Sequence, residues 1–215
     1  MSPLLPDKVG YLQHIDLQKL SELADRNQLN LYLNVRTGAF LHLSFPLLYT
    51  RQALSPEQVQ ALRDAFTVGE QRSFDQDPRF GLCVLSEIAS RALSPAVNDP
   101  GTAIDIIGRA VRLFSQHAEA GQGTTPYPRL FMRPADIRDL FDDIFTPIAR
   151  DGAALVEVHV RLQKAFLALT QYKPLLYAQE ARRHSRQALE RARQGLTLSD
   201  DIRRIEELTA GLTER

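Results

Sequence analysis

The chain has 215 residues, of which 44% are hydrophobic and 24% are charged, a composition that is ordinary for a globular protein and excludes a disordered chain. Its 26 basic and 26 acidic residues cancel, so no overall field attracts nucleic acid, and we expect no nucleic-acid partner. No run approaches the roughly 20 apolar residues of a membrane span, and the first residues lack the basic start and apolar core of a signal peptide. From these patterns we expect a soluble chain.

The first part of the sequence predicts short strands followed by a helix. Val9–Ile15 is typical of a strand, and Asp16 can cap the helix that follows. Residues 29–35 alternate apolar and polar side chains, which predicts a half-buried strand. After a turn at Gly38, Phe40–Ser44 is expected to return beside that strand as a hairpin.

A second helix is indicated by the spacing of its first residues. Ser55 and Gln58 have the spacing of a capping box, and Pro56 occupies the first helical position. Thr67–Gly69 is a further strand candidate. We therefore expect a small mixed sheet of about three to five strands with two helices.

The central stretch from Arg72 to Asp105 predicts two helices joined by a tight turn. Apolar residues recur at helical spacing in the first helix: Phe80, Val84, Leu85, Ile88, Ala89 and Ala92. Pro95 is expected to end that helix at Ser94. Asp99 can cap the next helix, with Pro100 at its first position.

The rest of the chain is predicted to be mostly helical. Residues 121–128 are typical of a surface loop, and Leu130–Met132 of a short strand. A helix beginning near Pro134 is expected to kink or end at Pro147, and another is expected over residues 153–171.

Two further helices are expected at the C-terminal end. Residues 173–193 hold six Lys or Arg and two Glu with few apolar positions, which indicates either a solvated face or a contact with a membrane surface or polyanion. The last helix has an apolar stripe and can fold back on the basic helix or pack against a second copy. The predicted fold class is α+β, with a small lobe over residues 1–72 and a helical lobe over residues 73–215.

Polar residues at the start of the second central helix are the first candidate site. Asn98, Asp99 and Thr102 lie where unpaired amides and the helix dipole favour an anion. Capping by Asp99 itself is the alternative, and its charge would repel that anion.

The loop before the first central helix is the second candidate. Arg72, Asp75, Gln76 and Asp77 can orient a ligand or hold a hard cation such as magnesium. Alternatively, these side chains tie the loop to its own backbone. If Gln76 and Asp77 reach Asn98 and Asp99, the two candidates form one polar network between the lobes.

Other chemical sites receive less support. Asp139 and Asp143 are spaced to share a cation, but acidic residues early in a helix are more often partners of its dipole. The five histidines show no paired spacing, so we predict no zinc site. We find no nucleophile elbow, phosphate-binding loop or dinucleotide fingerprint. The sequence assigns no catalytic residue, metal or cofactor, and enzymatic activity stays open.

The hallmark of a known family is similar to several of these segments. It covers Gln76, Asp77, Phe80 and Gly81, then Ile88, Ala89 and the run from Arg91 to Pro95, then Asn98, Asp99, Pro100, Thr102 and Ala103. Gly10–Asp16 and the pattern of Gly38, Phe40, Pro46 and Leu47 also match. The chain thus resembles the predicted-membrane-protein family called domain of unknown function 2254. The resemblance spans residues 9 to about 165 and implies a soluble region that follows a block of membrane helices, with no established activity.

Two functions follow from the resemblance and the candidate residues. The first is a non-enzymatic regulatory or assembly domain that self-associates through apolar stripes of the C-terminal helices. Its partner would be the membrane-spanning portion, and the domain itself would lie on the cytoplasmic side of the membrane. The alternative is a ligand-binding or metal-binding domain, with possible hydrolytic activity, whose site lies between the lobes. That site would use Arg72, Gln76, Asp77, Asn98, Asp99 and Thr102.

Overall fold

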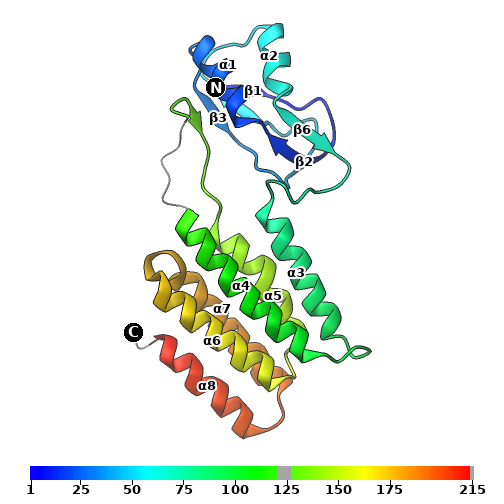
Figure 1. The fold of residues 1–215 in the computed structure, drawn as a ribbon, viewed down its shortest axis with the longest axis vertical. Helices are drawn as coiled ribbons and strands as arrows, with labels where there is room; N and C mark the ends of the chain where they lie inside the picture. The colour runs from blue at the N-terminus through cyan, green and yellow to red at the C-terminus, as the bar shows by residue number, and fades with distance from the viewer. Residues whose placement is uncertain (121–126, 214–215) are drawn as a thin grey trace. The chain divides into compact units, whose positions relative to one another are not determined.

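The chain divides into two compact units in a computed structural model that describes residues 1–120 and 127–213 (Figure 1). The first unit comprises Met1–Gly81 and Thr124–Pro134, and the second comprises Leu82–Gly123 and Ala135–Arg215. The described sheets belong to the first unit and a helical bundle makes up the second, which confirms the predicted α+β class. The domain bounds predicted from the sequence, 1–72 and 73–215, stay predictions.

The first unit holds two small sheets rather than the one sheet that we expected. The four-stranded sheet has the order β1-β5-β3-β7, in which β7 runs parallel to β3 and the other neighbours are antiparallel. The three-stranded sheet is antiparallel, in the order β4-β2-β6. The strands are β1 (Ser2–Leu4), β2 (Gly10–Ile15), β3 (Leu31–Leu33), β4 (Phe40–Leu41), β5 (Leu48–Thr50), β6 (Phe66–Gly69) and β7 (Leu130–Phe131).

Both predicted helix starts of this unit are confirmed. Helix α1 (Leu17–Arg26) begins after Asp16, whose carboxylate accepts a hydrogen bond from the Lys19 amide at 2.8 Å. Helix α2 (Pro56–Arg63) begins with the reciprocal capping box of Ser55 and Gln58. These helices share one apolar core with the strands, which includes Leu12, Leu20, Leu31, Leu48 and Leu62.

The predicted hairpin between residues 29–35 and Phe40–Ser44 is wrong. Strand β4 pairs with β2, because Gly38 donates to the Leu12 carbonyl at 2.7 Å and Leu12 donates to Ala39 at 2.9 Å. The partners of β3 are β5 and β7. Alternation of apolar side chains marks which face of a strand is buried, but it does not name the neighbour.

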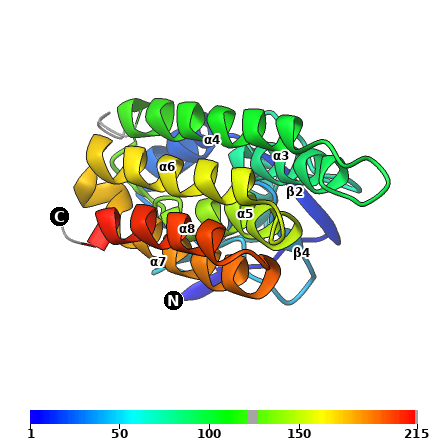
Figure 2. The ribbon, with the colours of Figure 1, turned by 90° about the horizontal axis from the view of Figure 1, so that it is seen from below.

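The second unit packs long helices around an aromatic core. Figures 1 and 2 both show α6 between α4 and α8, with which it packs; α6 also packs against α7. The chain enters this unit within α3. The helices are α3 (Pro78–Ala92), α4 (Pro100–Ala120), α5 (Ile137–Asp151), α6 (Val156–Tyr172), α7 (Pro174–Gly195) and α8 (Ser199–Thr213).

The aromatic core explains why these helices stay together. The rings of Phe114, Phe141, Phe145 and Tyr177 contact one another at centroid separations of 4.7 to 6.0 Å. The buried Tyr177 hydroxyl donates to the Phe114 carbonyl at 2.6 Å, so its burial leaves no unpaired polar atom.

Among the described residues, no helix combines the length and the apolar character that a membrane span requires.

Helix α5 does not end at Pro147, so that one of the two outcomes predicted for this position is wrong. Helix α5 continues through it to Asp151. The side chains of Phe145, Ile148 and Ala149 on either side are buried, so packing offsets the hydrogen bond that a proline removes. The loop predicted over residues 121–128 falls largely on residues outside the described part of the chain.

The basic helix has a larger buried face than its apolar content indicated. In α7 the buried positions recur every three or four residues but are occupied mainly by small or polar side chains: Tyr177, Glu180, Ala181, His184, Ser185, Ala188 and Ala192. Helix α8 folds back on α7, where Arg193 pairs with Glu206 at 2.7 Å and Arg182 donates to the Leu212 carbonyl at 3.0 Å. The fold-back arrangement of the last helix is therefore the one that the structure adopts.

His159 of α6 is a histidine that the fold buries completely. It has no exposed surface, and neither ring nitrogen makes a hydrogen bond of normal geometry. Burial lowers the pKa of His159 to about 4; the nearby backbone of Ala153 opposes this shift in part, and the charge of Arg191 adds to it. The folded chain therefore holds this imidazole neutral at pH values where an unfolded chain protonates it.

This difference predicts a loss of stability in mild acid. Between the ordinary histidine pKa of about 6.5 and the folded value of about 4, the unfolded chain binds a proton that the folded chain does not, so stability falls as the pH falls. From pH 7.5 to 5.0 we expect wild type to lose about 2 kcal/mol more unfolding free energy than His159→Leu does. Urea unfolding followed by circular dichroism measures both losses. His14→Leu, at an exposed histidine, should behave like wild type, and equal losses in wild type and His159→Leu would contradict the expectation.

Candidate functional site

The loop candidate is a locked structure within the first unit. Arg72 makes a bidentate pair with Asp77, with Nε to Oδ2 at 2.7 Å and Nη2 to Oδ1 at 2.9 Å. The Asp77 side chain is only 2% exposed, while that of Arg72 is 22% exposed. The Arg72 guanidinium also lies over the Phe80 ring, 5.0 Å from its centroid. These contacts fix the loop before α3 in one conformation.

Asp77 also starts the helix that follows it. Its carboxylate accepts from the Phe80 amide at 3.0 Å, and Pro78 takes the first helical position, where no amide is needed. Gly38 has a φ of 86°, and a Cβ at that position would overlap the Asp77 carboxylate. Glycine at 38 thus serves both the turn and the burial of the carboxylate.

Gln76 connects the same loop to the three-stranded sheet. Its side-chain carbonyl accepts from the Ile15 amide at 3.0 Å, and its amide group donates to the Ile15 carbonyl at 3.5 Å, at the end of β2. The Thr37 hydroxyl donates to the Gln76 backbone carbonyl. Asp75 is exposed, and its carboxylate faces solvent. Of the four loop residues, it alone takes no part in the side-chain contacts described for Arg72, Gln76 and Asp77.

The turn candidate is held together inside the second unit. Asp99 accepts from the Thr102 amide at 3.1 Å and from the Thr102 hydroxyl at 2.5 Å, which caps α4. The Thr102 hydroxyl, followed by its amide, holds the pKa of Asp99 below its ordinary value. Asn98 has a φ of 50°, a left-handed conformation that asparagine tolerates better than most residues.

The structure thus brings the six predicted ligand residues together as two groups. Arg72, Gln76 and Asp77 are joined in the first unit, and Asn98, Asp99 and Thr102 lie at one helix start in the second. Each group already has a structural task, because it satisfies the backbone of its own helix start. Binding of a ligand by the two groups together stays a prediction.

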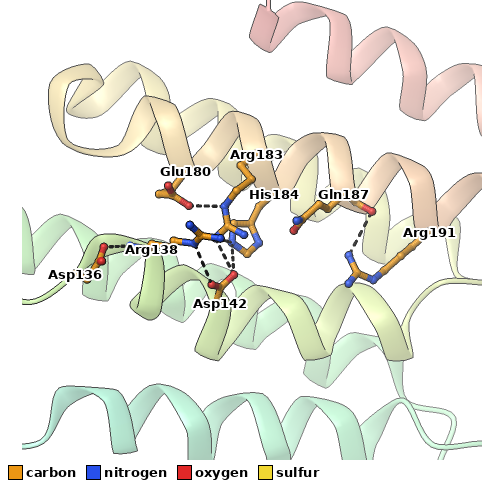
Figure 3. Close-up of polar contacts among 8 residues, drawn as sticks. All are labelled: Asp136, Arg138, Asp142, Glu180, Arg183, His184, Gln187 and Arg191. Atoms are coloured by element: carbon orange, nitrogen blue, oxygen red, sulfur yellow. Dashed lines mark hydrogen bonds and ion pairs between the residues drawn. The ribbon is translucent and has the colours of Figure 1, made fainter.

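Sequence reasoning missed a polar cluster between α5 and α7 (Figure 3). Arg183 lies between two carboxylates, at 2.7 Å from Asp142 and 2.5 Å from Glu180. His184 Nε2 lies 3.1 Å from the same Asp142 oxygen, Oδ1. The partners on α5 and α7 are about 40 residues apart in sequence, so no local spacing reveals them. The sequence showed only the neighbouring Asp139 and Asp143 and, separately, the basic run of residues 173–193.

The cluster ties α7 to α5 rather than offering a reactive imidazole. The His184 ring is 3% exposed and faces the rings of Phe141, Phe145 and Phe166. Burial lowers the pKa of His184 to about 4, and the charge of Arg183 adds to this shift, while Asp142 opposes it. The imidazole is therefore neutral near pH 7, and its contact with Asp142 positions the two helices.

The acidic run on α5 divides between several tasks. Asp136 caps the helix by accepting from the Arg138 amide at 2.9 Å, as expected of a dipole partner. Asp142 belongs to the cluster just described. Within the described ranges, 1–120 and 127–213, no group of three or more histidine, cysteine or acidic side chains is placed to hold a metal ion.

Loss of the buried carboxylate is expected to weaken the first unit strongly. Asp77→Ala leaves the Arg72 guanidinium without its bidentate partner and α3 without its cap, so we expect an unfolding free energy about 3 kcal/mol lower. Asp77→Asn retains a capping oxygen and should lose less. Asp75→Ala, at an exposed carboxylate in the same loop, should change stability by less than about 0.5 kcal/mol. Denaturant unfolding ranks the three variants, and an Asp77→Ala chain as stable as Asp75→Ala would contradict the structural task.

Comparison with known proteins finds mycobacterial relatives of about half of the chain. An uncharacterized protein of Mycobacterium bovis is 35% identical over 111 residues, and so is one of Mycobacterium tuberculosis strain H37Rv. Each match covers 49% of this chain and 21% of the relative, so the chain spans about a fifth of the length of these curated relatives. No solved structure matches the chain.

The family match covers most of the chain, including both halves of the hallmark. The family described as "Predicted membrane protein (DUF2254)" matches residues 2–168. The chain therefore belongs to the DUF2254 family of predicted membrane proteins.

Proposed function

We propose that the chain is a regulatory and assembly domain of a larger membrane protein and that it self-associates through the edge of its three-stranded sheet. Membership of a predicted membrane protein family supports the first part, as does the relatives' much greater length. In this proposal the partner is the membrane-spanning portion, and the domain works on the cytoplasmic side. The observation that carries self-association is an apolar surface along β4.

This surface, the edge-strand patch, consists of exposed apolar side chains around an edge strand. Their exposed fractions are 57% for Val9, 58% for Phe40, 54% for Leu43 and 38% for Phe45. Residues 38–46 contain no charged residue. Natural edge strands usually carry lysine or other charges that prevent pairing with another chain, so an uncharged, apolar edge favours a partner.

The patch is ordered, which reduces the entropy lost on association. The Phe40 ring packs edge-on against Tyr11, with centroids 5.1 Å apart, and the Phe45 ring lies 5.7 Å from His42. Because β4 pairs with β2 on one side, its other side can pair with β4 of a second copy around a two-fold axis. Such pairing would join two three-stranded sheets into one.

By contrast, the apolar stripe of the last helix is used inside the second unit. Ile205 and Leu212 of α8 are buried, and Thr209 between them is 7% exposed. We therefore assign self-association to the edge-strand patch rather than to the C-terminal helices.

A charge placed in the patch should disrupt the assembly. We expect wild type to form dimers as its concentration rises, and Leu43→Lys to weaken the dimer by at least about tenfold, because the ammonium would be buried in the contact. Light scattering coupled to size exclusion measures both. Val97→Lys changes a residue that is equally exposed, at 54%, in the second unit and should dimerise like wild type. A wild-type chain that stays monomeric at high concentration would refute the self-association.

A further inference from the structure

A groove of about 430 Å³ lies on the second unit, along one face of α4. Its α4 residues recur at intervals of three or four positions along the helix, so they share that face. Arg161 of α6, which packs against α4, lines the groove as well. The α4 residues that line it include Asp105, Gly108, Arg109 and Arg112.

The groove is positively charged although the chain as a whole is neutral. Three arginines face one carboxylate, so the lining has a net charge of +2. Arg109 pairs with Asp105 at 2.6 Å, one turn away on the same helix. Arg112 and Arg161 are exposed and make no hydrogen bond or ion pair with any residue that the structure describes. Two guanidinium groups are therefore available to an anion at this surface.

Gly108 forms the floor of the groove beneath Arg161. A Cβ at this position would lie 3.1 Å from the Arg161 Nη2 atom, so the guanidinium rests almost on the α4 backbone. Glycine weakens a helix interior, and here its missing side chain leaves room for the Arg161 guanidinium against the helix. Positive charge and open space thus coincide at one place.

We propose that this groove binds a phosphate group. The planar guanidinium fork matches phosphate oxygens in a bidentate manner, and a phosphate monoester carries close to two negative charges at neutral pH, which matches the lining. The volume suits a small ligand or a headgroup. Because Asp99 already caps α4, the arginines and not the helix start hold the anion. The site lies in the second unit, so it does not depend on the edge-strand patch.

Two groove variants and a matched control test this site. Inorganic phosphate is titrated at constant ionic strength and followed by phosphorus NMR. The double variant Arg112→Gln/Arg161→Gln should bind at least about tenfold more weakly than wild type, since it loses both unpaired guanidinium groups. Gly108→Leu should lose binding to the same extent with its charge unchanged, because leucine fills the groove and suits a helix. The control Arg186→Gln/Arg204→Gln loses the same charge at exposed positions of α7 and α8 and should bind like wild type.

A second measurement distinguishes the source of the phosphate. Wild type and the same variants are sedimented with phosphatidylcholine vesicles that either contain or lack phosphatidic acid, whose headgroup is a phosphate monoester. Retention on phosphatidic acid vesicles that both groove variants lose identifies a lipid headgroup. Binding of inorganic phosphate without vesicle retention identifies a soluble phosphate compound. Wild-type chain that binds neither probe, or control and groove variants that lose binding equally, would overturn the proposal.

Discussion

The bidentate pair between Arg72 and Asp77 is the interaction on which the loop before α3 depends. One buried carboxylate neutralises a guanidinium, caps α3 and fills the space above Gly38. A buried ion pair of this kind adds little net stability compared with an apolar substitute, but it tolerates no loss of one partner. The loop before α3 is therefore fixed in one conformation. Asp99 with Pro100 repeats the arrangement of Asp77 with Pro78, so both central helices begin at an aspartate followed by a proline.

Local chemistry predicted the elements well, because it acts over a few residues. The caps at Asp16, Ser55 and Asp99 each combine an acceptor with the amides two or three positions later, and the structure confirms all three. Pairing between strands was not predictable in the same way. Two-residue periodicity places one face of a strand in the core, but β4 meets β2 because of backbone bonds at Gly38 that the periodicity does not encode.

The candidate site shows the same limit more sharply. The hallmark residues were recognisable, and the cap of α4 by Asp99 was predicted, but the contact of Gln76 with Ile15, 61 residues away in sequence, was not. The cluster of Asp142, Arg183 and His184 could not, because its members come from helices far apart in sequence and look like ordinary surface charges. The buried face of α7 was not predicted either, because few of its buried residues are large and apolar. Its small residues, such as Ala181 and Ala188, allow close helix packing without raising the apolar content of the segment.

The path of the chain has a consequence for how the first unit is made. Strand β7 closes the four-stranded sheet beside β3, yet Leu130 follows Leu31 by almost a hundred residues, with helices α2, α3 and α4 between them. During synthesis, β3 is therefore complete long before its parallel neighbour leaves the ribosome, and non-local pairing of this kind slows folding. While α3 and α4 are being synthesised, the edge of β3 that will pair with β7 has no partner in the nascent first unit. Any shortened gene that stops before Tyr127 would encode a sheet that permanently lacks its last strand.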